Sequence, residues 1–168
     1  ALTLPKGVQA LHLGSIALVE GADATAWADL FAAAAGAGVV TSLDPNVRTL
    51  LADAHESEYR ARLAAMAGQA SIIKLSDEDI GWWFPGKPAA QALADLAALA
   101  PQAVLILTQG PGAVLCRWPG GHFAHQPAPL AKLGDTVGAG DTLMAATLAG
   151  LSRRGLLARD ALTAAVQG

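Results

Sequence analysis

Residues 71–79 read SIIKLSDED, and this short stretch already indicates the class of fold. Its first part, Ser71–Leu75, is a short and mostly apolar run, which predicts a fully buried strand. Residues 76–79, a serine and three acids, follow at once. Because acids suit the positive end of a helix dipole, they predict the start of a helix. A strand that leads directly into a helix is the repeating unit of a mostly parallel sheet.

The same alternation of apolar runs and alanine-rich stretches continues toward the amino terminus. Strands are predicted over Val8–Ile16 and Val39–Leu43. A helix capped by Asp23 or Thr25 is expected to run to about residue 35, where two nearby glycines end it. Another helix is predicted over Ser57–Gly68.

The alternation also continues toward the carboxyl terminus. A helix is predicted from Pro88 to about residue 99, and a strand over Val104–Thr108. A Gly-Pro-Gly turn leads into Ala113–Trp118, so these two strands are expected to pair as a hairpin. A third strand is predicted over His122–Ala128. The last helix runs through Leu151 and is hydrophobic on nearly every face, so we expect it to be buried inside the domain.

Composition excludes several classes of protein. The 168 residues predict one domain, and a hydrophobic content of 53% is ample for a core and excludes intrinsic disorder. A net charge of −3 argues against a general nucleic-acid binder. The single Cys116 excludes an internal disulfide framework and fits a reducing cytoplasm. The longest apolar stretch near the start, Val8–Val19, is shorter than the ~20 residues of a membrane span.

Residues 135–141 read DTVGAGD and carry the clearest sign of chemistry. Gly138 and Gly140, on either side of Ala139 and just before a helix, leave the backbone free to turn its N–H groups outward, which makes a site for an anion. Asp141 begins that helix. A carboxylate beside an anion site is explained if it takes the proton of a hydroxyl that attacks the bound phosphorus. The alternative is an ordinary loop with Asp141 as a plain N-cap.

Two other nucleotide-binding patterns are missing from the sequence. A dinucleotide fingerprint would need a third glycine at position 143, where Leu143 stands. No Gly-Lys-Ser/Thr of a Walker motif occurs either. The missing fingerprint argues against a dinucleotide oxidoreductase.

Four motifs together resemble one known family. Residues 135–141, with TLMAA after them, closely resemble the second signature of the PfkB/ribokinase family of carbohydrate kinases. SLDPNVR at 42–48 and IKLSDED at 73–79 resemble motifs of its fructokinase-like branch, and LTQGPGA at 107–113 resembles the strand and turn that lie along the nucleotide. The resemblance implies a ribokinase-like α/β fold, with three α/β/α layers and a mostly parallel sheet that has an antiparallel hairpin at its edge.

The chain is expected to be part of such a domain. It begins at Ala1 without a Met and ends at Gly168 in what looks like the middle of a helix. We therefore interpret residues 1–168 as the C-terminal portion of a single ribokinase-like domain, without its N-terminal sugar-binding and lid region and without its extreme C-terminus. In the family that lid often mediates dimers, so the resemblance implies a homodimer through the absent lid.

The resemblance implies that phosphoryl transfer takes place at the glycine-rich loop. Asp141 would be the general base that deprotonates the sugar hydroxyl, and it would therefore also face the substrate. The backbone N–H groups of Gly138, Ala139 and Gly140 would form the anion hole for the γ-phosphate.

The resemblance also implies sites for a monovalent cation and for the nucleotide. Asp135 and the carbonyl of Val137 fall where many relatives hold a cation, usually K⁺, which takes oxygen ligands. Thr108 and Gly110 would border the phosphates or the ribose of ATP.

The acidic segment is expected to serve Mg²⁺. The family motif reads Asn-x-x-Glu, whereas Ser76 and Asp79 stand at its two ends here. Because Asp is shorter than Glu and Glu78 is adjacent, either Glu78 or Asp79 could serve the metal. The alternative is that this acidic run only caps a helix. Lys74 could reach a phosphate, or it could be a solvated charge at the end of a strand.

Substrate-binding residues are expected after the second strand. Asp44, Asn46 and Arg48 lie beyond its end, where open α/β sheets bind their ligands. Arg48 could contact a phosphate or the substrate, and Asn46 could hydrogen-bond the same group. The alternative is an Asp-Pro-Asn turn that leaves Arg48 on the surface.

Together these features predict a kinase that transfers phosphate from ATP to a sugar hydroxyl, with a fructose-like ketohexose as acceptor. Its partners would be ATP and a small sugar, with no nucleic acid and no membrane. One alternative is a kinase for 2-keto-3-deoxygluconate, another sugar or a nucleoside. The other is a non-catalytic fragment that binds a nucleotide or a sugar. We expect the isolated chain to bind nucleotide weakly and to turn over no sugar.

Overall fold

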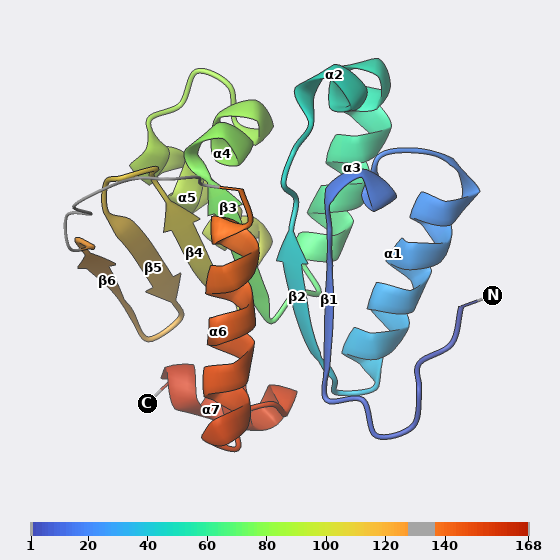
Figure 1. Cartoon of the computed structure of the whole chain (residues 1–168), viewed down its shortest axis with the longest axis vertical. Coiled ribbons are helices and arrows are strands. Elements are labelled where there is room, and N and C mark those ends of the chain that lie inside the picture. Colours follow the sequence, from blue (N-terminus) through green and yellow to red (C-terminus); the bar gives the residue numbers. More distant parts are fainter. Residues whose placement is uncertain (1, 128–136, 168) are drawn as a thin grey trace.

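The computed structural model describes residues 2–127 and 137–167. Within them, six strands form one sheet in chain order (Figure 1). The strands are β1 (Ala10–Gly14), β2 (Val40–Asp44), β3 (Ile72–Ser76), β4 (Val104–Thr108), β5 (Val114–Trp118) and β6 (Gly121–His125). Strands β1 to β4 pair in parallel, and β5 and β6 add an antiparallel extension. The predicted parallel sheet and its hairpin edge are confirmed.

Helices cover both faces of the sheet and make three layers (Figure 1). One face is covered by α1 (Gly21–Gly36), α3 (Glu56–Ala67), α4 (Asp77–Trp83) and α5 (Ala89–Leu99). The other face is covered by α6 (Ala139–Arg153) and α7 (Arg159–Gln167). Three short elements follow β1 and β2, namely η1 (Ser15–Leu18), α2 (Thr49–Ala52) and η2 (Asp53–His55).

The alternation of side chains along the strands divides the apolar residues into two cores. Successive side chains of a strand point to opposite faces of the sheet. Leu43 and Ile73 therefore pack in the larger core, on the side of α1, α3, α4 and α5. Val40 and Ile72 face the other way and pack with Met144 of α6. Even-numbered residues of β2 and β3 thus point toward α6.

The predicted cap of α1 is wrong. The helix begins at Gly21, two residues before Asp23, and its N-cap is Glu20, which makes no side-chain capping hydrogen bond within the described residues. Asp23 lies in the first turn instead. An acid there still complements the helix dipole without being the cap, so the sequence signal was real but was assigned to the wrong position.

The predicted burial of α6 is also wrong. Among the described residues of α6, Met144 alone is fully buried, while Leu148 is half-buried and Ala145 and Ala149 are exposed. Alanine has the highest helix propensity and little apolar surface to hide, so an alanine-rich helix does not need burial on every face. Of the helices that the described residues form, none combines the length and the apolar character that a membrane crossing requires.

Candidate active site

The sequence motifs meet at the carboxyl ends of the parallel strands. Asp44 is the last residue of β2, and Ser76 and Thr108, the last residues of β3 and β4, are paired in register. Because parallel strands end at the same edge of a sheet, the loops that follow them lie together. Helix α6 begins at this edge too, since a Cβ placed on Gly140 would lie 2.7 Å from Nζ of Lys74.

A buried ion pair joins β2 and β3 beneath the start of α6. The register pairs Leu43 with Ile73, which brings Asp44 beside Lys74. Nζ of Lys74 lies 3.1 Å from Oδ2 and 3.3 Å from Oδ1 of Asp44, and the side chains are 7% and 5% exposed. Burial raises the pKa of the Asp44 carboxyl, and the Lys74 charge opposes that rise. The alternative that Lys74 is a solvated charge is therefore wrong.

The loop after β2 is held in place by two other elements. The Tyr59 hydroxyl of α3 donates to the Pro45 carbonyl at 3.3 Å, and the Val47 N–H donates to Oδ1 of Asp79 at 2.7 Å. Asn46 between them has a φ of 42°, in the left-handed region, which is uncommon for any residue but glycine. Burial raises the pKa of the Tyr59 phenol, with a further contribution from the Asp79 charge, so its O–H stays a donor.

Asp79 connects this loop to the start of α4. Its Oδ2 accepts from the backbone N–H and from the hydroxyl of Ser76, each at 2.7 Å, and Ser76 Oγ accepts from the Asp79 N–H in return. These reciprocal bonds are a capping box, so the predicted helix start is confirmed. Both carboxylate oxygens of the buried Asp79 are thus engaged by the chain's own donors.

The candidate metal ligands lie in different settings. Glu78 is exposed on α4, whereas Asp79 offers few unused lone pairs, because a carboxylate has about four and three hydrogen bonds already occupy Asp79. In the described part of the chain, no three His, Cys, Asp or Glu side chains gather as a metal site. Val137 is 88% exposed, and Asp135, the other residue predicted to hold K⁺, lies outside the described residues.

Gly138 and Asp141 define the beginning of α6. Gly138 is the N-cap, with a φ of 76° that suits glycine, and its carbonyl accepts from the Thr142 N–H at 2.8 Å. The alternative that Asp141 is the N-cap is therefore wrong. The Asp141 side chain is exposed in the first turn, and among the described residues none forms a hydrogen bond or an ion pair with it.

The other predicted contacts lie along the same edge or in the loops beyond it. Thr108 is half-buried, and its hydroxyl donates to the Leu75 carbonyl at 3.3 Å. Gly110 is exposed in the turn after β4, with a φ of 53°. Arg48 is exposed at the N-cap of α2, whereas Asn46 is half-buried.

Sequence reasoning did not single out Tyr59 or the pairing of Asp44 with Lys74. Tyr59 lies in a helix, and no local pattern relates it to a loop 14 residues earlier. For Asp44 and Lys74, part of the signal is present in the alternation, because both stand at even-numbered positions and therefore on the strand faces that point toward α6.

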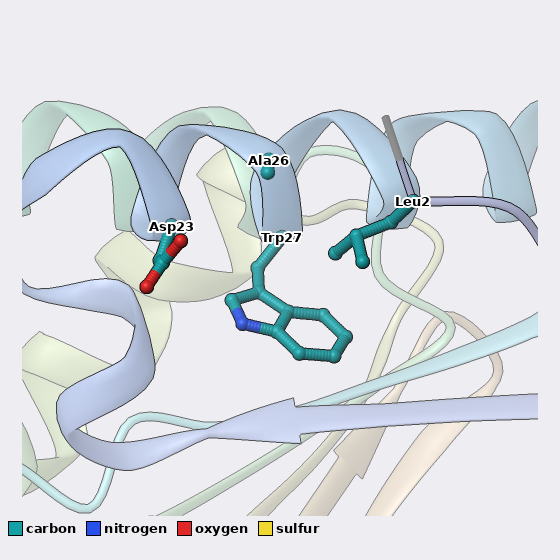
Figure 2. A pocket seen from close by; sticks show the side chains of 4 residues that line it. All are labelled: Leu2, Asp23, Ala26 and Trp27. Atoms are coloured by element: carbon teal, nitrogen blue, oxygen red, sulfur yellow. The ribbon is translucent and has the colours of Figure 1, made fainter.

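A shallow pocket of about 400 Å³ lies elsewhere, beside α1. Figure 2 shows Leu2 and Trp27 close together at this pocket, with Asp23 and Ala26 on the helix above. Its lining is mostly apolar and includes none of the predicted site residues. It has no chemistry that suits a phosphate.

Asp79→Asn is expected to lower the free energy of unfolding by about 2–3 kcal/mol, because one acceptor oxygen becomes an NH₂ group that faces buried N–H donors. Urea unfolding measures this loss. Asp77→Asn is the matched control, since Asp77 is an exposed acid in the same first turn and should cost at most about 1 kcal/mol. Equal losses for the two variants would contradict a role for Asp79 in holding the loop.

Comparison with known proteins shows which family the chain matches. Residues 3–167 match the family described as "pfkB family carbohydrate kinase". A fructokinase of Klebsiella pneumoniae is 35% identical over 149 residues, which are 88% of this chain and 48% of that protein. The chain thus spans about half the length of the curated relatives it matches.

Solved structures of sugar and nucleoside kinases are similar to the chain in three dimensions. A fructokinase of Vibrio cholerae, with fructose, ADP and a calcium ion bound, has a TM-score of 0.76 and 25% identity, and the match covers 91% of this chain and 50% of that one. An aminoimidazole riboside kinase of Salmonella enterica, with aminoimidazole riboside and an ATP analogue bound, has a TM-score of 0.76 and 26% identity, and the match covers 94% and 53%.

Proposed function

Because this chain belongs to the pfkB family of carbohydrate kinases, we propose that it carries the phosphoryl-transfer site of an ATP-dependent sugar kinase. The resemblance inferred from four motifs is confirmed at the level of the family. The chain corresponds to about half of its relatives, so we interpret it as the portion that binds ATP and supplies the base.

One observation carries this proposal, namely that Lys74 and the amino end of α6 converge beside an exposed Asp141. The lysine is a full positive charge, and the amides of Gly138, Ala139 and Gly140 lie at the positive end of a helix dipole. This arrangement suits a phosphoryl group. A carboxylate beside it suits a proton acceptor better than a phosphate ligand.

The proposed reaction is one in-line transfer. Asp141 accepts the proton of the sugar hydroxyl as its oxygen forms a bond to the γ-phosphorus, and the bond from that phosphorus to the β-phosphate oxygen breaks. ADP leaves with the electron pair of the broken bond. Lys74 and the amides of the glycine loop stabilise the charge on the transferring group, and a preorganised donor of this kind typically contributes ~10²–10³-fold.

Other residues are proposed to position the two substrates. Thr108 and Gly110 border the nucleotide, and Asn46 and Arg48 contact the sugar. Mg²⁺ bound with ATP would neutralise charge on the phosphate oxygens.

The metal ligands follow from the contacts of the acidic residues. Glu78 has an exposed carboxylate for Mg²⁺, whereas Asp79 would act through water because its oxygens are already engaged. Asp135 and the carbonyl of Val137 are proposed to hold K⁺.

The proposed acceptor is a fructose-like ketohexose, since the curated relatives at 30–35% identity are fructokinases or probable fructokinases. A nucleoside is the second candidate, because the aminoimidazole riboside kinase has the same TM-score as the fructokinase with fructose, ADP and calcium bound. A cytoplasmic location is proposed from the single cysteine. The homodimer through a lid region stays a prediction.

Two assays test the proposal. The 168-residue chain is titrated with ATP by calorimetry, and weak binding without sugar turnover is expected. The full-length protein is then assayed with ATP and Mg²⁺ on fructose, 2-keto-3-deoxygluconate and a riboside, with and without K⁺. Preferential phosphorylation of fructose is expected. Nucleotide binding without transfer to any acceptor would favour the non-catalytic alternative.

A further inference from the structure

We propose that Asp44 is a positioning residue, whose carboxylate holds the Lys74 ammonium beneath the first turn of α6, where Lys74 can contact a transferring phosphoryl group. The inference rests on the proposed function and adds to it a residue that none of the sequence motifs assigns to phosphate.

The placement of Lys74 depends on Asp44. Both side chains are almost fully buried, and the carboxylate faces the ammonium with both of its oxygens, at 3.1 and 3.3 Å. Gly140 also lies next to the ammonium, because a Cβ placed there would come within 2.7 Å of Nζ and within 4.0 Å of Oδ2 of Asp44. The ammonium thus lies close both to the Asp44 carboxylate and to the backbone of the glycine loop.

The charges at this position favour an incoming anion. An ammonium next to the amino end of a helix is unfavourable by itself, because both are positive. Asp44 offsets the charge of Lys74, and Asp141 is the acid in the first turn of α6. The other charged groups that act on Asp44 are Asp79 and, to a smaller extent, His12, which is hydrogen-bonded to Ser42 on the same face. A phosphoryl group placed here would interact favourably with the Lys74 ammonium and with the amides of α6.

The hydrogen-bonding capacity of Lys74 also favours the binding of an anion. An ammonium has three donors, and in the described part of the chain its recorded partners are the two oxygens of Asp44. The distances exceed the 2.7–2.9 Å typical of charge-assisted bonds, so the pair is not at its tightest.

Stability alone does not explain the pair. Replacing a buried ion pair by apolar residues is often neutral or stabilising, so its presence is weak evidence of a purely structural role. Removing one partner only is strongly destabilising, whereas removing both charges together is tolerated better. A double variant therefore keeps the test interpretable if a single variant unfolds.

The test is a double-mutant cycle on phosphate binding. Wild type, Asp44→Asn, Lys74→Met and the double variant are titrated by calorimetry with ATP, adenosine and inorganic pyrophosphate. Lys74→Met is expected to weaken ATP binding by ~10-fold or more and to leave adenosine binding within ~2-fold. Asp44→Asn should weaken ATP binding by ~3–10-fold with Lys74 present, and by less than ~2-fold in the Lys74→Met background.

Two further variants serve as controls. Asp44→Glu keeps the carboxylate and is expected to restore most of the ATP affinity that Asp44→Asn loses. Asp95→Asn removes one partner of an exposed ion pair with Lys87, whose Nζ lies 2.5 Å from Oδ2, and should leave both affinities unchanged.

The outcomes separate this inference from the proposed function. An unchanged ratio of ATP to adenosine affinity in Asp44→Asn would overturn the inference, even if the full-length protein phosphorylates a sugar. If no sugar is phosphorylated but the Asp44 and Lys74 variants weaken pyrophosphate binding in the pattern expected for ATP, the kinase proposal fails and the role of Asp44 stands. Wild-type protein that binds neither ATP nor pyrophosphate would contradict both.

Discussion

Asp141→Asn is expected to lower the rate of sugar phosphorylation by the full-length protein at least ~100-fold, because an amide cannot accept the hydroxyl proton. The exposed carboxylate in the first turn of α6 has no partner among the described residues, so its replacement breaks no hydrogen bond or ion pair with them. Affinity for ATP should therefore stay within ~2-fold. Steady-state kinetics with saturating ATP, together with calorimetric titration of ATP, measure the two effects separately.

Asp160→Asn is the matched control for this variant. Asp160 is also an exposed acid in the first turn of a helix, but that helix is α7 and begins beyond the far end of α6. Its replacement removes the same charge and the same favourable interaction with a helix dipole. Turnover of Asp160→Asn should equal that of the wild type. Near-normal turnover of Asp141→Asn would reject Asp141 as the base.

Gly14→Ala is expected to reduce the free energy of unfolding by about 3 kcal/mol or more, the upper range for overpacking. A Cβ on Gly14 would lie 1.8 Å from the carbonyl oxygen of Asp44, so two backbones have to separate. The backbone of Gly14 is extended, which any residue can adopt, and the obstacle is therefore space alone. Urea denaturation followed by circular dichroism measures the loss.

Gly14→Ala should also affect the site, because Gly14 pairs in register with Asp44, which holds Lys74. A lower affinity for ATP is therefore expected in the protein that still folds. Gly36→Ala is the control, since a Cβ there meets no described atom within 4 Å, and it should be neutral or stabilise by up to about 1 kcal/mol. Equal urea midpoints for Gly14→Ala and wild type would contradict the close approach of β1 and β2.

Much of the fold could be predicted because its signals are local. The strand Val104–Thr108 was predicted with the bounds that the structure has, and the hairpin after it follows from the Gly-Pro-Gly turn. Ser76 and Asp79 are three residues apart, the spacing of a capping box, and they form one. Signals that are spread over a whole helix predicted burial less well. The apolar character of α6 did not indicate which of its faces packs against the sheet.

The candidate site was less predictable. The family motifs identified the stretches of sequence that form the candidate site. They did not identify the donors that form hydrogen bonds with the Asp79 carboxylate. Asp79 bonds to the Val47 N–H, 32 residues away, and this contact arises because the loops after β2 and β3 lie side by side. No sequence pattern within either loop predicts a hydrogen bond between residues so far apart in the chain.

The sequence by itself determined the order of strands and helices, the polar residues at the strand ends and the glycine-rich start of α6. Each of these follows from periodicity, capping or turn chemistry within a few residues. Only the tertiary structure decided that Asp44 faces Lys74 and that Lys74 lies beneath Gly140. The reason is that register and the approach of a helix to a sheet are set by packing between distant segments, where the whole core contributes to the free energy.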